Sequence, residues 1–309
     1  MTMTNGQLLS RRGVLTMGVT GLTATGLAAA GLATAPAARA ATSTARAATS
    51  TGPAGVRAPW AMIADAASGA DIWSRSSTTA RPMGSITKVM TAYIVVRAGG
   101  LGRVITVPEA VRGYDDYYDA STAGLVPGER MTAWDLLVGM LLPSGCDAAY
   151  TLAAAYGPGT TRFVDTMNAT AKAMGLGHTH FTDFSGLPAG GEYATYSSAG
   201  NLVTLGRAAM RYPAFRQIVA MSEYRLAAGA GHRAHTWTNL NPLLGRYPGA
   251  IGLKTGYTAA AGDCLLFEAT RGSRALIGVV LHSSDSLTGL DVAASDAEEM
   301  LNYGFAHYR

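Results

Sequence analysis

The sequence feature that most restricts the fold is a series of three short apolar segments near the end of the chain. They span residues 251–256, 264–270 and 275–281, and the turns between them are short and contain glycine. Parallel neighbours need a crossover of about a dozen or more residues, so strands this closely spaced pair antiparallel. The pattern predicts an antiparallel sheet, followed by a last helix over about residues 290–305.

Two further strands are predicted where the folded part begins, and helices are predicted in the middle of the chain. Residues 60–65 and 70–73 lie on either side of a Ser68-Gly69 turn. Apolar residues with helical spacing follow, with Thr132 as an N-cap. The helices are expected at about residues 85–98, 132–142, 147–156, 160–174 and 199–211. We predict an α+β fold: an antiparallel sheet that both chain ends build, flanked by helices, plus a mainly helical insert.

Two polar segments of the insert have other predicted structures. Residues 114–119, Tyr-Asp-Asp-Tyr-Tyr-Asp, are predicted to form a solvated loop, with the rim of a cleft as the alternative. His178 and His180 form an H-x-H pair in a second loop. No glutamate stands three residues before any histidine of the chain, so the usual zinc patterns are absent. We therefore expect no metal site.

The first part of the chain differs in composition from the rest. Arg11 and Arg12 precede a long uncharged stretch of Ala, Gly and Thr, which ends at a cleavage pattern, Ala38-Arg39-Ala40. We expect residues 1–40 to be a secretory signal peptide of the twin-arginine type, with an uncleaved membrane anchor as the alternative. Residues 41–57 are expected to form a low-complexity linker, and residues 58–309 the catalytic domain.

Charge and cysteine content exclude some classes of function. The chain has 24 basic and 20 acidic residues, a net charge of +4. The predicted signal holds three of the arginines and no acid, which leaves the mature chain near neutrality. The remainder has no basic run, so we expect no nucleic-acid partner. Cys146 and Cys264 are too few for a disulfide framework, and their spacing leaves a single bridge open.

Ser85 and Lys88 form an S-x-x-K pair at the start of a predicted helix. They lie on one face, one turn apart, and the free N–H groups of a helix start favour developing negative charge. A serine needs an adjacent base to be a good nucleophile, and a neutral lysine is such a base. The chain has only three lysines among its 24 basic residues. Arginine cannot be deprotonated, so the choice of lysine here points to an amine function.

Two more motifs follow in a characteristic order. Ser144-Gly145-Cys146 falls in a predicted turn between helices, and Lys254-Thr255-Gly256 falls on a predicted strand. S-x-x-K, S-D-N and K-T-G together are the signature of penicillin-recognising serine enzymes. Over roughly residues 58–306 the chain resembles low-molecular-mass penicillin-binding proteins, the D-alanyl-D-alanine carboxypeptidase family of serine peptidases. The resemblance extends to Leu141-Leu142-Pro143, Gly186-Leu187-Pro188 and Tyr257-Thr258.

The resemblance implies a β-lactamase-like fold and a role for each motif residue. Ser85 would attack the carbonyl of the penultimate D-Ala and form an acyl-enzyme. Lys88 would take its proton, and Ser144 would relay a proton toward the leaving D-Ala amine. These three residues are the expected catalytic set, and they require no cofactor.

The same resemblance implies a substrate-binding set. Lys254 would supply positive potential, and Thr255 would bind the substrate carboxylate. The N–H groups of Ser85 and Tyr257 would form the oxyanion hole. The substrate-binding residues expected from the motifs are Cys146, Lys254, Thr255, Gly256 and Tyr257.

The implied function is a serine D-alanyl-D-alanine carboxypeptidase of the cell wall. Its partners would be peptidoglycan stem peptides that end in D-Ala-D-Ala, and β-lactam antibiotics, which it would bind covalently. It would work as a monomer, secreted to the cell-wall side of the membrane, in peptidoglycan synthesis and cell shape. An enzyme that is mainly a transpeptidase is the alternative activity.

Two departures from the family pattern affect the site. The middle motif ends in Cys146 where most members have Asn, and a thiol is a weak donor and a weak acceptor. Many members also carry an arginine before the last helix, whereas this chain has no Lys or Arg between Arg274 and Arg309. We therefore expect altered substrate orientation and more reliance on Thr255 and Lys254 for the carboxylate.

Three other classes of protein fit the sequence less well. A class A β-lactamase needs a deacylating glutamate in an E-x-x-x-N loop, and neither Glu192 nor Glu223 has an Asn at that spacing. A non-catalytic cell-wall binding protein, with Cys146 as a sign of lost activity, is opposed by the intact Ser85 and Lys88. A metallopeptidase is opposed by the absent zinc patterns.

Overall fold

The computed structural model of the chain describes residues 52–286 and 290–308. The predicted signal peptide and most of the predicted linker lie outside these residues. Among the helices of the described part, none has the length and apolar character needed to cross a membrane.

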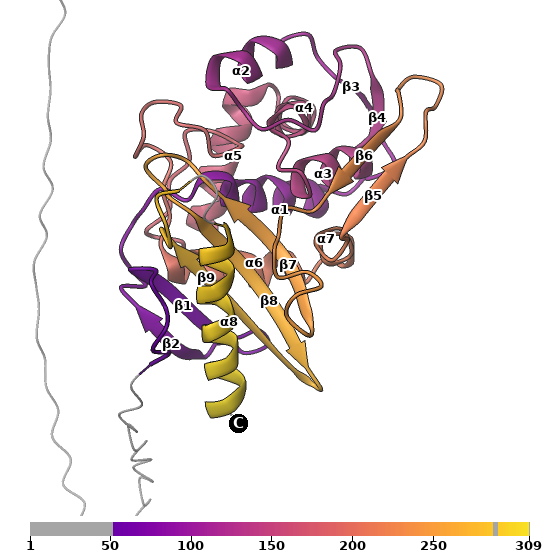
Figure 1. Cartoon of the computed structure of the whole chain (residues 1–309). Helices are drawn as coiled ribbons and strands as arrows, with labels where there is room; N and C mark the ends of the chain where they lie inside the picture. Colours follow the sequence, from indigo (N-terminus) through magenta and orange to yellow (C-terminus); the bar gives the residue numbers. More distant parts are fainter. Residues whose placement is uncertain (1–51, 287–289, 309) are drawn as a thin grey trace, which may run out of the picture. The chain divides into compact units, whose positions relative to one another are not determined.

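A five-stranded antiparallel sheet joins the two ends of the described chain (Figure 1). Its strand order is β2-β1-β9-β8-β7, so β1 from the first part of the chain pairs with β9 from the last. The three closely spaced segments at the end of the chain are antiparallel neighbours, as predicted. The strands are β1 (Trp60–Asp65), β2 (Asp71–Arg75), β7 (Ala250–Gly256), β8 (Cys264–Arg271) and β9 (Arg274–Leu281).

Alternating side chains of the central strands enter two different cores, because successive residues of a strand point to opposite faces. On β8, Leu265 and Phe267 pack with the last helix, α8 (Leu290–His307), whereas Leu266 packs with the helical insert. Both faces are thus covered. This explains why β8 is nearly all apolar from Cys264 to Ala269, with the buried Glu268 as the exception, rather than alternating.

The insert is mainly helical; much of it stands at the upper end of the sheet in Figure 1, while one of its helices, Ala199–Met210, packs on a face of the sheet against β1 and β9. Two small antiparallel pairs lie within it, β3 (Val104–Thr106) with β4 (Arg130–Thr132) and β5 (Glu223–Leu226) with β6 (His235–Thr238). Its helices are the 3₁₀ turn η1 (Gly84–Thr87), α1 (Lys88–Ala98), α2 (Val111–Tyr118), α3 (Ala133–Leu141), α4 (Cys146–Tyr156), α5 (Thr160–Ala173), α6 (Ala199–Met210) and α7 (Pro213–Val219).

Side-chain caps fix two of these helix starts. The predicted N-cap Thr132 accepts a hydrogen bond from the backbone N–H of Asp135, and Ser198 accepts one from Asn201. Such caps satisfy backbone donors that have no partner inside the helix. They fix the residues at which α3 and α6 begin.

The prediction of a solvated loop at residues 114–119 is wrong. Residues Val111–Tyr118 form helix α2, which packs on α4. Val111 is buried, and the Tyr114 ring lies against Tyr150 and Phe184. Val111, Tyr114 and Tyr118 follow the i, i+3, i+7 spacing of one helix face, and the three intervening or adjacent aspartates concealed that spacing.

Residues just before the predicted domain start at residue 58 already contact the fold. Val56 is already buried, and the backbone N–H groups of Arg57 and Ala58 donate to the Asp296 carboxylate of α8, each at 2.8 Å. The Arg75 guanidinium also holds the carbonyl of Val56 at 2.9 Å. The composition of this segment gave no sign that α8 would bind its backbone.

Candidate active site

Ser85 and Lys88 meet at the junction of η1 and α1. The Lys88 Nζ atom lies 2.8 Å from Ser85 Oγ. The turn depends on Gly84, which has a φ of +52°, and a Cβ there would lie 2.7 Å from the backbone nitrogen of Tyr257. Only glycine permits both the backbone angle and the close approach. The predicted nucleophile thus sits where the start of the helix meets the end of β7.

Lys88 is fully buried and has three hydrogen-bond partners from three segments of the chain. Besides Ser85, its Nζ atom contacts the carbonyl oxygen of Ser185 at 3.0 Å and the sulfur of Cys146 at 3.3 Å. These contacts hold the amine in a single orientation against the serine hydroxyl.

Ser144 and Gly145 lie in the turn between α3 and α4, as predicted, whereas Cys146 is already the first residue of α4. Ser144 has a φ of +66°, which is a strained conformation for a residue other than glycine. A neighbouring residue, Ser121, holds the turn: its hydroxyl donates to the Ser144 carbonyl at 2.9 Å, and its own carbonyl accepts the Cys146 N–H at 2.8 Å. Strained backbone of this kind is frequent at active sites, where it aims a side chain.

Asp147 anchors the loop that supplies Ser121. Its carboxylate, fully buried at the start of α4, accepts hydrogen bonds from the backbone N–H groups of Ala123 and Leu125 at 2.8 and 2.9 Å. Burial raises the pKa of Asp147, and these hydrogen bonds together with the Lys88 charge oppose the rise. The loop after α2 is therefore tied directly to the middle motif.

Lys254 lies on β7, on the sheet side of the site, and is also buried. Its Nζ atom contacts the carbonyl oxygen of the adjacent Thr255 at 3.1 Å and its hydroxyl at 3.4 Å. Burial, and next the charge of Lys88, hold the pKa of Lys254 well below its usual range, and Cys146 opposes this. Both buried lysines therefore belong to one electrostatic site.

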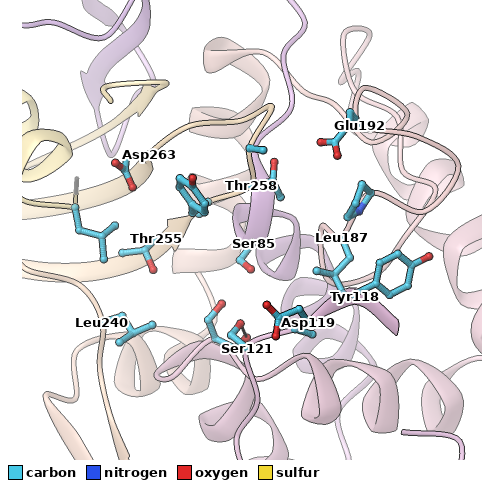
Figure 2. Close-up of a pocket in the computed structure, with 17 residues that line it drawn as sticks. Ser85, Tyr118, Asp119, Ser121, Leu187, Glu192, Leu240, Thr255, Thr258 and Asp263 are labelled. Carbon is cyan, nitrogen blue, oxygen red and sulfur yellow. Dashed lines mark hydrogen bonds between the residues drawn. The ribbon is translucent and has the colours of Figure 1, made fainter. Parts of the chain in front are cut away.

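A cavity of about 570 Å³ opens above these residues (Figure 2). Its charged lining is acidic and comes from Asp119, Glu192 and Asp263, while Lys88 and Lys254 lie beneath the surface that lines it. Five of the predicted site residues line the cavity, namely Ser85, Ser144, Thr255, Gly256 and Tyr257. Cys146 is buried and contacts Lys88 in this structure, so its predicted substrate contact stays a prediction.

The motifs missed a second group of lining residues. Tyr118, Asp119 and Ser121 come from the end of α2 and the loop after it, and Leu187 and Glu192 come from the segment after α5. The acidic and aromatic composition of segment 114–119 is a partial signal, because it also fits the rim of a cleft, and Tyr118 and Asp119 line the cavity. Nothing in the sequence marked Ser121.

The geometry suits nucleophilic acyl transfer. A serine hydroxyl at a helix start lies in hydrogen-bond contact with an amine, next to N–H groups at the end of β7. Within the described residues no cluster of His, Cys, Asp and Glu is arranged to hold a metal ion. Both cysteines are buried and free, so the single bridge left open by their spacing is not formed.

Comparisons with known proteins agree with this geometry. A profile of the family described as D-alanyl-D-alanine carboxypeptidase matches residues 44–285. A D-alanyl-D-alanine carboxypeptidase of Streptomyces sp. strain K15 is 39% identical over 253 residues, which cover 77% of this chain and 84% of the relative. A second, from Mycobacterium tuberculosis strain H37Rv, is 36% identical and covers 82% of this chain and 84% of the relative.

Solved structures show the same architecture. The crystal structure of the Streptomyces K15 DD-transpeptidase matches with a TM-score of 0.75 at 37% identity, covering 81% of this chain and 98% of that one. The D-alanyl-D-alanine carboxypeptidase of Mycobacterium tuberculosis matches with a TM-score of 0.72 at 36% identity, covering 81% and 91%.

Proposed function

Because the chain belongs to the D-alanyl-D-alanine carboxypeptidase family of serine peptidases, we propose that Ser85 is its nucleophile, with Lys88 as the base. The family resemblance and the α+β fold predicted from the sequence are both confirmed. The protein is a penicillin-binding enzyme of this family, which acts on peptidoglycan peptides ending in D-Ala-D-Ala through a serine acyl-enzyme.

Acylation begins at the contact between Lys88 and Ser85. Lys88 Nζ accepts the hydroxyl proton while Ser85 Oγ forms a bond to the carbonyl carbon of the penultimate D-Ala. The carbonyl oxygen becomes an oxyanion, which the N–H groups of Ser85 and Tyr257 receive. Collapse of this intermediate breaks the C–N bond, and Ser144, which lines the cavity, delivers the proton to the departing amine of D-Ala.

The sheet side of the cavity binds the substrate's terminal carboxylate. Thr255 presents its hydroxyl to the cavity, and Lys254 beneath it supplies positive potential. Deacylation by water gives the carboxypeptidase reaction, and deacylation by an amine gives transfer. The resting geometry serves both, since either nucleophile enters where the D-Ala amine has left.

The contact of 2.8 Å between Lys88 Nζ and Ser85 Oγ carries this proposal, and β-lactam labelling tests it. Intact-mass spectrometry should show a stable adduct on the wild type and none on Ser85→Ala. Ser121→Ala is the matched control, because Ser121 also lines the cavity but contacts neither lysine, and it should still be labelled. An adduct that persists in Ser85→Ala would refute the assignment.

A second experiment separates hydrolysis from transfer. The enzyme is incubated with a D-Ala-D-Ala depsipeptide, with and without glycylglycine, and the products are identified by mass. Carboxypeptidase activity gives the shortened acid in both cases. Conversion to the glycylglycine adduct alone would make the chain mainly a transpeptidase, and no product would indicate a binding protein.

The predicted export and oligomeric state belong to the same proposal. The Arg11-Arg12 pair and the Ala38-Arg39-Ala40 pattern support secretion by the twin-arginine route, and a substrate in the cell wall also supports export. N-terminal sequencing of enzyme recovered outside the cytoplasm should begin at Ala41. Light scattering should give the mass of a monomer.

A further inference from the structure

We propose that Tyr114 of α2 is a positioning residue for the Ser85–Lys88 pair. It acts through Ser185, whose carbonyl oxygen accepts a hydrogen bond from the Lys88 amine and so fixes the orientation of that amine. This inference rests on the proposed roles of Ser85 and Lys88. It extends the reaction machinery to a helix that none of the three motifs contains.

The number of N–H bonds on the Lys88 amine explains why the Ser185 carbonyl affects its orientation. A neutral amine has two N–H donors and one lone pair, and Nζ has three partners, at Ser85, Cys146 and Ser185. A carbonyl oxygen can only accept, and a sulfur is a weak acceptor. With one N–H on the Ser185 carbonyl and the other toward Cys146, the lone pair faces the hydroxyl of Ser85. A shift of this carbonyl would turn the lone pair away.

Asp183 and Tyr114 together hold Ser185 in place. One oxygen of the buried Asp183 carboxylate accepts the N–H and the hydroxyl of Ser185, both at 2.7 Å, as well as the N–H groups of Gly186 and Leu187. The other oxygen accepts the hydroxyl of Tyr114 at 2.6 Å. The Tyr114 oxygen also lies 2.6 Å from the Ser185 hydroxyl. Tyr114 therefore contacts both Asp183 and Ser185 in the turn that residues 183–187 form.

The same turn also packs closely against the backbone next to the nucleophile. Gly186 has a φ of +92°, and a Cβ there would lie 2.0 Å from the carbonyl oxygen of Gly84, the residue before Ser85. Ser185 itself is fully buried. A displacement of this turn therefore reaches Ser85 through its backbone and Lys88 through its amine.

The Tyr114 ring is fixed by its surroundings. It stacks on Phe184 with 5.2 Å between ring centroids, and Tyr150 lies 5.2 Å away on another side. The Phe184 carbonyl is in turn held by the Thr91 hydroxyl at 2.6 Å. Burial, and then the negative charge of Asp183, raise the pKa of Tyr114, so its hydroxyl remains a donor. The hydroxyl is a rigid link between α2 and the turn.

Tyr114→Phe tests the link, because it keeps the ring and removes both hydroxyl contacts. We expect the second-order rate of β-lactam acylation to fall about tenfold, since small misplacements of reacting groups are costly. The final yield should remain one adduct per chain. With the depsipeptide substrate, kcat should fall and KM should change less than about twofold, because Tyr114 is not part of the cavity lining.

Tyr150→Phe is the matched control. Its ring belongs to the same cluster, and its hydroxyl has no hydrogen-bond partner among the described residues. It should acylate at the wild-type rate. A slow rate in both variants, or a reduced final yield at a normal rate in Tyr114→Phe, would mean that Tyr114 only supports folding, and the proposal would fail. An unchanged rate in Tyr114→Phe would also overturn it.

Ser185→Ala removes the other partner of the Tyr114–Ser185 contact. It can replace Tyr114→Phe in the test if that variant does not fold. It removes the hydroxyl and leaves the carbonyl, so a loss of about threefold is expected. The double variant should lose less than the product of the two single losses, because both changes act on one contact. Fully independent effects would contradict the route through Ser185. Labelling of Ser85→Ala would instead refute the proposed function, so the two failures are distinguishable.

Discussion

The helical side and the sheet side of the cavity each bury one lysine, and the two are held in opposite ways. Lys88 has partners from three segments of the chain, whereas the described contacts of Lys254 are with its neighbour Thr255 alone. A base must direct a lone pair at one hydroxyl, and that requires fixed geometry. A source of positive potential only has to lie nearby. The difference in anchoring therefore separates the two roles.

The largest expected effect comes from replacing Lys88, the lysine that has three hydrogen-bond partners. Lys88→Arg keeps a positive charge but cannot accept a proton from Ser85, and the loss of a general base costs about 10²- to 10⁴-fold in rate. Stopped-flow measurement of β-lactam acylation gives the rate, and circular dichroism checks the fold. A variant that acylates at the normal rate would show that Lys88 is not the base.

A smaller effect is expected when the same exchange is made on the sheet side. Lys254→Arg keeps the charge that the substrate carboxylate needs, so the loss should stay within about tenfold. The variant also has a pH signature. Because the pKa of Lys254 is lowered, the wild type should lose this charge, and its KM should rise, at a pH where an ordinary lysine is still protonated.

The control for the pH dependence of KM in the wild type is the pH dependence of KM in Lys254→Arg. Arginine stays charged throughout the accessible range, so KM of Lys254→Arg should stay flat where that of the wild type rises. Equal rises in both proteins would assign the effect to another group and would remove Lys254 from carboxylate binding.

Cys146 lies between the two sides, since it contacts Lys88 and influences Lys254. An Asn at this position could accept from Lys88 and donate to the substrate, a contact of about 1 kcal/mol. Cys146→Asn should therefore raise the acylation rate several-fold. Cys146→Ala should stay near the wild type, because a thiol bonds weakly. Loss of acylation in Cys146→Ala would give the sulfur a positive role.

The smallest expected effect concerns stability on the helical side. Burial, and then Asp147 and Asp116, raise the pKa of Asp115 on α2 to about 7, and one of its oxygens has no hydrogen-bond partner among the described residues. The folded state therefore favours the protonated form, so stability falls as pH rises from the ordinary value of 3.8 through about 7. Asp115→Asn should raise the melting temperature at pH 8 by about 2 °C.

The pH comparison supplies the control for this variant. At pH 4 most of the wild-type carboxyl is protonated in the folded protein, so the two melting temperatures should nearly coincide. A gain that is the same at both pH values would come from helix propensity or packing and not from ionisation.

The sheet and the motif residues could be predicted because their signals are local in the sequence. The strand predicted at 264–270 ends one residue before β8 does, and the strand predicted at 275–281 begins one residue after β9 does. The spacing of Ser85 and Lys88 allowed them to be placed on one helix face. Side-chain identity and periodicity carry this information directly.

The anchoring of Lys88 could not be predicted for a physical reason. Its firmest acceptor is the backbone carbonyl of Ser185, and a carbonyl is present in every residue, so no residue type marks it. The helix that holds this turn, α2, was concealed by Asp115 and Asp116, which interrupt its apolar spacing. The contact of Cys146 with Lys88 likewise depends on tertiary packing, which the motif spacing does not reveal.

The pairing of β1 with β9 has a consequence for how the protein is made. Trp60 lies opposite Leu281, so a central pair of the sheet joins two segments that nearly the whole domain separates in sequence. Strands this distant pair slowly, because a long loop must close first. While the chain is being synthesised, β1 exposes an unpaired edge until the ribosome has completed β9. Chains that end before Arg274 should therefore aggregate rather than accumulate as a shortened enzyme.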